Sequence, residues 1–235
     1  MADTAMAQFT SDITVNLVDS NLSDDRVCLA ARTSTAGADA NPEATRGLIN
    51  SLMRNRHGSP FEHMAATWQV TAPLFVWREH HRHRIASYNE ESGRFKVLDP
   101  VFYIPGPDRP LVQTGKAMAY ELHPGDDDQY ATAVCQIKSR SVTAYRSYQL
   151  LLQLGIAREV ARDVLPVNIM STYIVTMNAR ALMNFLSLRV NSPDSAYPSK
   201  PLHEIQMVAD QYESTFAQHA PITHAAFVTN GRVAP

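Results

Sequence analysis

One stretch of the chain, Arg78–Arg94, restricts the possible folds and functions more than any other. It reads REHHRHRIASYNEESGR and holds four arginines and three histidines, followed by Ser, Tyr, Asn and Glu side chains. Almost every one of these side chains donates or accepts hydrogen bonds, and almost none is a core former. Such a run is a solvated surface, a disordered tract or a binding site.

The residues before this stretch argue against disorder. Pro73 is well placed to open a helix, and Leu74–Trp77 supplies an apolar first turn that a core can bury. We expect this helix to continue into the arginines, so that Arg78 and Arg82 share one face. Four guanidinium groups within 17 residues suit several phosphates, because each binds an anion bidentately. A solvated basic face is the alternative, but the mixed donors and acceptors that follow favour a site for a heterocycle or a sugar.

The overall charge argues against a general nucleic-acid-binding protein. The 235 residues include 21 Lys and Arg against 23 Asp and Glu, a formal net charge of -2. The positive charge is therefore local, and a small anion is a better partner than a long polyanion. Cys28 and Cys135 lie far apart, which excludes a disulfide framework, and we expect both to be small core residues. The sequence shows no signal peptide and no membrane span, so we expect a cytoplasmic protein without a membrane partner.

The remaining pattern predicts a mixed α/β (α+β) fold in a single domain over residues 1–235. Strands are expected at residues 13–18, 64–71 and 168–177, from alternation and β-branched side chains. Helices are expected at residues 24–32, 42–54, 128–154, 157–164, 178–189 and 202–216, several of them after Ser or Asn caps. Residues 105–128 and 190–201 are expected to form turns and loops. No GxGxxG or P-loop pattern occurs, so side chains must hold any anion.

Two further segments present arginines at element ends. Arg158 and Arg162 are four residues apart, and Arg180 and Asn184 share a face of the helix that Asn178 caps. Separate elements that each present arginines can build one large anion site, although a cap with surface polar residues is the alternative.

The histidines do not predict a metal site. His57, His63, His80, His81 and His83 lack the HExxH spacing with a carboxylate. The neighbouring arginines would also repel a divalent cation.

These residues resemble the signature of the flavin-dependent thymidylate synthases. That signature is Arg-His-Arg, seven residues and then Ser, and here it reads Arg82-His83-Arg84, residues 85–91 and Ser92. The flanking segments at residues 57–63, 165–166, 178–180 and 184–189 also match, and the resemblance covers roughly residues 12–220.

The resemblance implies a fold, a reaction and an assembly. The fold is an α/β domain with a central mixed, largely antiparallel sheet flanked by long helices. The reaction is the reductive methylation of dUMP to dTMP. The carbon comes from 5,10-methylenetetrahydrofolate and the hydride from FADH2, which NADPH regenerates from FAD. The assembly is a homotetramer with shared active sites, and no nucleic acid is a partner.

The resemblance also implies roles for individual residues. Arg189 is the catalytic residue, because a fixed cation against the uracil ring favours the N3-ionised base. The FAD-binding positions are Ser59, Arg82, His83, Arg84, Glu90, Asn178, Ala179, Arg180 and Asn184. The dUMP-binding positions are Glu79, His80, His81, Arg82, Glu90, Glu91, Ser92, Gly93, Arg94, Arg162 and Arg189.

Some features leave alternatives open. Ser92 is a conceivable nucleophile, but no His–carboxylate base is evident for it, so a phosphate-binding role is preferred. Glu79 stands where many family members carry Gln, and the loop over residues 191–201 is longer than usual. A module that binds RNA or a nucleotide without chemistry is one alternative function. A family member that keeps the fold and the flavin but not the synthase activity is another.

Overall fold

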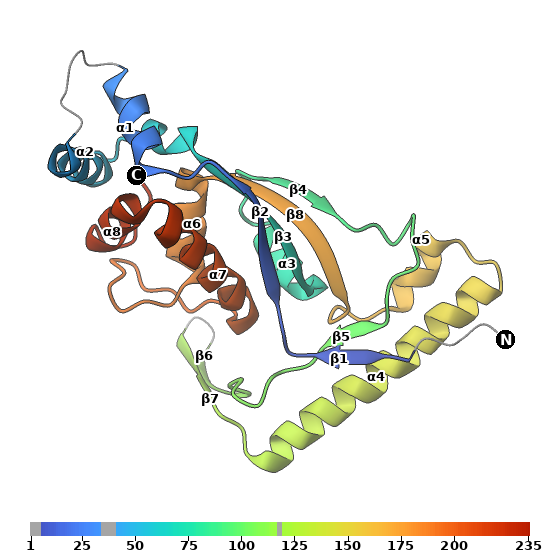
Figure 1. The fold of residues 1–235 in the computed structure, drawn as a ribbon. Helices are drawn as coiled ribbons and strands as arrows, with labels where there is room; N and C mark the ends of the chain where they lie inside the picture. Colours follow the sequence, from blue (N-terminus) through green and yellow to red (C-terminus); the bar gives the residue numbers. More distant parts are fainter. Residues whose placement is uncertain (1–5, 34–40, 117–118) are drawn as a thin grey trace. The chain divides into compact units, whose positions relative to one another are not determined.

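The computed structural model describes residues 6–33, 41–116 and 119–235. These residues divide into two compact units. Figure 1 labels their helices and strands. The first unit is formed by the described residues within 1–12, 72–77 and 91–171, and the second by those within 13–71, 78–90 and 172–235. The single domain over residues 1–235 stays a prediction.

Most residues of a four-stranded sheet belong to the second unit. Its strands lie in the order β2 (Thr14–Ser20), β3 (Ala65–Pro73), β8 (Met170–Asn178) and β4 (Ser87–Glu90). The pairs β2–β3 and β4–β8 are antiparallel. Hydroxyl pairs join β3 to β8, with Thr67 and Thr176 in hydrogen bond at 2.9 Å and Thr71 and Thr172 also at 2.9 Å. Side chains along β8 alternate between buried and half-buried, as a strand with one core face requires.

Helices accompany this sheet in the second unit. They are α1 (Asp24–Arg32), α2 (Pro42–Arg54), a 3-10 turn (Ser59–His63), α6 (Ala179–Arg189), α7 (His203–His219) and α8 (Pro221–Thr229). The expected caps are confirmed, since Ser23, Asn41 and Asn178 each accept a backbone hydrogen bond at a helix start. Trp68 and Tyr212 are fully buried, with ring centroids 4.5 Å apart. Fully burying a large apolar side chain contributes about 1.5–3 kcal/mol, so this core is a main source of stability.

The first unit is built on a long helix. It holds α4 (Asp127–Gln153), α5 (Arg158–Ala161), a 3-10 turn (Arg162–Val164), the parallel pair β1 (Gln8–Thr10) and β5 (Val101–Tyr103), and the hairpin β6 (Val112–Lys116) and β7 (Ala119–His123). Asp126 and Gln129 form a capping box at the start of α4. Tyr145 and Tyr148 on this helix pack with Phe102, Ala161 and Ile169 to form the core of the unit.

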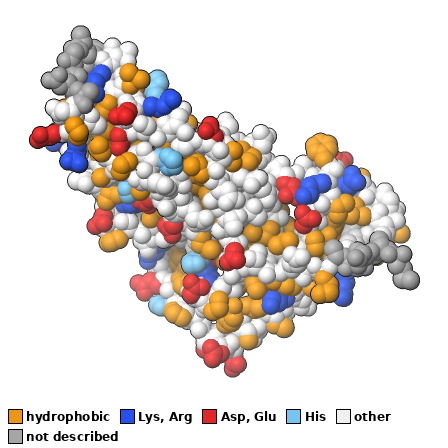
Figure 2. All heavy atoms as spheres, viewed as in Figure 1, with side chains coloured by type: hydrophobic (Ala, Val, Ile, Leu, Met, Phe, Trp, Pro, Cys, Tyr) orange, Lys and Arg blue, Asp and Glu red, His pale blue; other side chains and the backbone are white. Residues whose placement is uncertain are grey.

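The predicted fold class, α/β (α+β) with a largely antiparallel sheet, is confirmed. No helix in the described part of the chain is long and apolar enough to cross a membrane. On the face drawn in Figure 2, acidic and basic side chains are interspersed rather than gathered by sign. This mixture agrees with the net charge of -2.

Several local expectations were wrong. Helix α3 (Leu74–His80) ends before Arg82, because the N–H groups of Arg82 and His83 donate to carbonyls three residues back. Residues 87–90, for which no strand was expected, form the edge strand β4. The expected turns of residues 105–128 contain the hairpin β6–β7, and α8 was not expected.

One cysteine expectation was also wrong. Cys28 is buried as expected, but Cys135 is exposed. Ser141, Tyr145 and Tyr148 occupy the buried side of α4, and the helical period places Cys135 on the other side.

Candidate functional site

A sharp turn after α3 presents the signature arginines. His80 is fully buried, with Nδ1 3.0 Å from the Tyr173 hydroxyl, and the His83 ring packs on Phe185 with centroids 4.6 Å apart. The Tyr88 hydroxyl donates to the backbone oxygens of His83, at 2.7 Å, and of His80, at 3.2 Å. The Tyr88 side chain, on the edge strand β4, therefore supports the turn. Two histidines face inward, and Arg82 and Arg84 are left exposed.

Both inward-facing histidines are neutral near pH 7. Burial, with the nearby cationic groups, holds the pKa of His80 well below its usual 6.5. Burial and then the Arg189 guanidinium lower the pKa of His83 to about 4. The positive charge of the turn at neutral pH therefore comes from its arginines.

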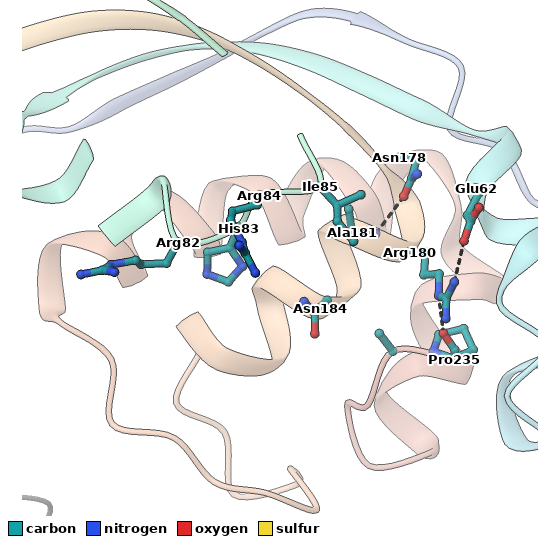
Figure 3. A pocket seen from close by; sticks show the side chains of 11 residues that line it. Glu62, Arg82, His83, Arg84, Ile85, Asn178, Arg180, Ala181, Asn184 and Pro235 are labelled. Atoms are coloured by element: carbon teal, nitrogen blue, oxygen red, sulfur yellow. Dashed lines mark hydrogen bonds and ion pairs between the residues drawn. The ribbon is translucent and has the colours of Figure 1, made fainter. Parts of the chain in front are cut away.

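A cavity of about 640 Å³ opens beside this turn (Figure 3). It is lined by Glu62, Arg82, His83, Arg84, Ile85, Asn178, Arg180, Ala181, Asn184, Ala234 and Pro235. The volume lies within the usual range for ligand pockets. The cavity thus brings together six of the nine residues expected to bind FAD. Of the other three, Ser59 is exposed on the 3-10 turn, Ala179 is fully buried, and Glu90 is exposed at the end of β4.

The junction of β8 and α6 supplies one wall of the cavity. The Asn178 side-chain oxygen accepts from the Ala181 N–H at 2.8 Å and so caps α6. Arg180 and Asn184, four residues apart on α6, both line the cavity, as their spacing predicts. The amino end of a helix attracts anions through its free N–H groups and its dipole. This wall therefore adds to the positive potential of the turn.

Arg82 and Arg84 are the free cations of the cavity. Among the described residues, neither guanidinium makes a hydrogen bond or an ion pair with another side chain. Arg180, in contrast, is bound by Glu62 and by the backbone oxygen of Pro235 (Figure 3). The cavity is therefore suited to an anionic ligand that takes up the two free guanidinium groups.

Arg189 forms a second cluster at the end of α6. Its side chain is 16% exposed, and Nη1 donates to Glu79 Oε2 at 2.7 Å. Nε donates to His83 Nε2 at 3.0 Å, so the His83 proton lies on Nδ1. Glu79 and His83 together fix the guanidinium in place. The carboxylate of Glu79, which would be poorly placed next to a phosphate by itself, has Arg189 as its ion-pair partner.

The other expected dUMP positions divide between the units. His81 is exposed in the turn and lies edge-on to Tyr88, with ring centroids 5.4 Å apart. Residues 91–94 and Arg162 belong to the first unit. There, a side chain at Gly93 would place its Cβ 3.1 Å from Arg162 Cδ, so the small residue allows the arginine to lie against this backbone.

Two ion pairs surround that segment of the first unit. Arg94 bonds Glu159 at 3.0 Å and Lys96 bonds Glu91 at 2.8 Å. Ser92 Oγ accepts from the Arg94 N–H at 3.3 Å. Within the described residues, no His or carboxylate is in hydrogen bond with Ser92, which favours a binding role over a nucleophilic one.

Sequence reasoning missed part of the cavity. Glu62 lies in the matching segment at residues 57–63 and Ile85 lies inside the signature, and neither had an assigned role. Ala234 and Pro235 carry no sequence signal, because a backbone oxygen contributes to a site wherever the fold places it. Across the described ranges, no group of three or more His, Cys, Asp or Glu side chains is placed to hold a metal ion.

Comparisons with known proteins define the class of this chain. The family model described as "Thymidylate synthase complementing protein" matches residues 16–222. A flavin-dependent thymidylate synthase of Tropheryma whipplei (strain TW08/27) is 52% identical over 232 residues, which cover 97% of each chain. One from Streptomyces avermitilis is 48% identical over 241 residues, covering 100% of this chain and 98% of the relative.

Solved structures agree with this assignment. The crystal structure of a UMP/dUMP methylase, PolB, from Streptomyces cacaoi bound with 5-Br UMP superposes with a TM-score of 0.93 at 49% identity. The match covers 97% of this chain and 99% of that one. This chain belongs to the family of thymidylate synthase complementing proteins, the flavin-dependent thymidylate synthases.

Proposed function

We propose that this chain is an FAD-dependent thymidylate synthase that methylates dUMP reductively to dTMP. The carbon donor is 5,10-methylenetetrahydrofolate, and NADPH regenerates FADH2. The observation that carries the proposal is the arginine-rich cavity with the fixed Arg189 beside the same turn, in a chain about half identical to flavin-dependent thymidylate synthases. The related PolB of Streptomyces cacaoi was solved bound with 5-Br dUMP, which supports dUMP as the substrate class.

The cavity residues fit FAD. A dinucleotide carries a pyrophosphate, and Arg82 and Arg84 are two guanidinium groups without another partner among the described side chains. Asn178 and Asn184 supply amides for ring edges. Gly58 keeps the cavity open at Arg180, since a Cβ there would lie 2.6 Å from Arg180 Nε. When bound, the reduced flavin supplies the hydride.

The role of Arg189 follows from how it is held. A cation that is already fixed next to the uracil stabilises developing negative charge without reorganising at the moment of reaction. Glu79 and His83 supply that fixation. The chain's own contribution to the chemistry is therefore to hold the uracil anion and to orient it against the flavin.

The remaining assignments follow the family positions. FAD binding is assigned to Ser59, Arg82, His83, Arg84, Glu90, Asn178, Ala179, Arg180 and Asn184. Binding of dUMP is assigned to Glu79, His80, His81, Arg82, Glu90, Glu91, Ser92, Gly93, Arg94, Arg162 and Arg189. His80 is the least accessible of these, because it is fully buried here. We further propose a cytoplasmic homotetramer with shared sites, which native mass measurement tests.

A second substrate has specific support. The PolB relative is described as a UMP/dUMP methylase and was solved with 5-Br UMP as well as 5-Br dUMP. We therefore include methylation of UMP as the second candidate. Parallel assays with the two nucleotides at equal concentration separate them by kcat/KM.

The main test uses the purified protein. It is expected to be yellow, to oxidise NADPH faster when dUMP is present, and to form dTMP. Arg189→Ala should abolish dTMP formation and leave FAD bound, and Arg46→Ala, at an exposed residue of α2, is the matched control. A colourless protein that takes up no FAD would refute the proposed function. Undiminished turnover by Arg189→Ala would refute only the catalytic assignment.

A further inference from the structure

The last residues of the described chain line the proposed flavin cavity. Ala234 and Pro235 belong to its wall, and Figure 3 shows Pro235 next to Arg180. All the residues involved belong to the second unit. We name residues 232–235 the C-terminal strap. Hydrogen bonds hold the strap at its start, its middle and its last residue.

The strap is anchored at its start by a buried arginine. Arg232 is 5% exposed, and its guanidinium donates to both Glu213 oxygens, at 2.8 and 2.7 Å. The same guanidinium lies over the Phe227 ring, 5.2 Å from its centroid. A bidentate pair of this kind fixes direction as well as position. The strap therefore leaves α8 along a defined path.

Arg56 holds the middle of the strap. Its Nη1 donates to the backbone oxygens of Val233, at 3.2 Å, and Ala234, at 2.9 Å. Arg56 follows the end of α2 in the left-handed region, with φ of 60°, a conformation that costs a non-glycine residue energy. The surrounding contacts must outweigh that cost. The two hydrogen bonds from Nη1 tie the strap to the end of α2.

The end of the strap holds Arg180. Arg180 Nε donates to the Pro235 backbone oxygen at 2.6 Å, and Nη1 donates to Glu62 at 2.6 Å. The side chains of Arg180 and Glu62 are 47% and 41% exposed, and an ion pair so exposed fixes little by itself. The strap oxygen is the second point that fixes the guanidinium. Nη2 makes no hydrogen bond to any described residue and is available to a ligand.

We propose that the C-terminal strap is a positioning element of the flavin site, which holds Arg180 so that its remaining N–H groups bind the flavin. This inference rests on the proposed function. Arg56 and Arg232 act through the strap and are positioning residues rather than ligand contacts. Gly58 leaves room for the strap, because a Cβ at this position would lie 2.8 Å from the Pro235 oxygen and would displace the strap.

The test removes the hydrogen bonds of Arg56 to the strap and leaves every residue that lines the cavity unchanged. Arg56→Ala should raise the Kd for FAD about tenfold, because a charge-assisted donor to two carbonyls is lost. Arg54→Ala, at the exposed last residue of α2, is the control and should bind FAD like the wild type. Arg56→Lys keeps a donor and should bind FAD within about threefold of the wild type. Flavin fluorescence titration measures each Kd, and thermal melting without FAD checks that all variants fold alike.

A double-mutant cycle tests whether the strap acts through Arg180. In an Arg180→Ala background, Arg56→Ala should add less than about twofold to the Kd, because the residue it positions is gone. Multiplicative effects, or an Arg56→Ala variant equal to Arg54→Ala in a yellow and active enzyme, overturn the strap proposal alone. A wild type that takes up no FAD overturns it together with the proposed function.

Discussion

Replacing Glu213 with Gln should destabilise the second unit in a pH-dependent way. Burial opposes ionisation of Glu213, but hydrogen bonds from His224 and Arg232 outweigh it and lower the pKa of this carboxyl from 4.5 to about 2. A shift of this size corresponds to about 3 kcal/mol of stability. Gln retains one acceptor for Arg232 but removes the carboxylate charge that is paired with this buried guanidinium. We therefore expect Glu213→Gln to lower the free energy of unfolding by about 2–3 kcal/mol at pH 7.

The pH dependence follows from the direction of that shift. Because the folded-state pKa lies below the unfolded-state value, the stabilisation is complete above pH 4.5 and is lost as the pH falls towards 2. At pH 3, less than about half of the difference between wild type and variant should remain. The pH window itself therefore identifies the carboxylate as the source.

Urea unfolding measures this difference. Trp68 reports on the unit, because it is fully buried against Tyr212, and a Trp77→Phe background leaves it as the one tryptophan. Glu43→Gln, at an exposed position of α2, is the control. The comparison requires that wild type and Glu213→Gln show the same urea dependence of the unfolding free energy. A difference in unfolding free energy between them below about 0.5 kcal/mol at pH 7 would then refute the reasoning. So would an undiminished difference at pH 3.

Two further predictions concern Arg189 and its partners. The Glu79 side chain is 40% exposed, so its ion pair with Arg189 contributes about 1 kcal/mol. Glu79→Ala should therefore lower kcat/KM about fivefold, and the kcat/KM of Glu79→Gln should lie within about twofold of the wild type. Equal rates for wild type and Glu79→Ala would contradict this. His83, with its pKa lowered to about 4, should stay neutral with the proton on Nδ1 down to about pH 5 in a nitrogen-15 NMR titration, and protonation near pH 6.5 would contradict it. Because the unfolded chain protonates this ring near pH 6.5, stability should fall as the pH drops from 6.5 towards 4.

Local chemistry explains what could be predicted from the sequence. The helix starts at Ser23, Asn41 and Asn178 were predictable because a cap is decided within a few residues. The cavity positions of Arg82 and Arg84 were predictable from the signature, and those of Asn178, Arg180 and Asn184 from a separate segment that also resembles the family. The face shared by Arg180 and Asn184 followed from the helical period.

Long-range contacts explain what could not be predicted. Helix α3 stops at His80 because the backbone turns there and Tyr88 binds the freed carbonyls, and Tyr88 is placed by the pairing of β4 with β8. The wall formed by Ala234 and Pro235 depends on Arg56 and Arg180, far from it in sequence. The exposure of Cys135 depends on which side of α4 the first unit covers. None of these features is indicated by the residues next to it in the sequence.

The bracing of the turn by Tyr88 also gives a physical reason for the length of the signature. Four of the seven residues between Arg84 and Ser92, Ser87–Glu90, lie in β4 and are paired one by one with β8. Side chains alternate along a strand, so inserting or deleting one residue before Tyr88 would turn its ring to the opposite face of the sheet. The hydroxyl would then lose both carbonyls of the turn. The number of residues in this part of the motif is therefore fixed by the pairing of β4 with β8. In distant relatives, substitutions in this segment should be tolerated more readily than insertions or deletions.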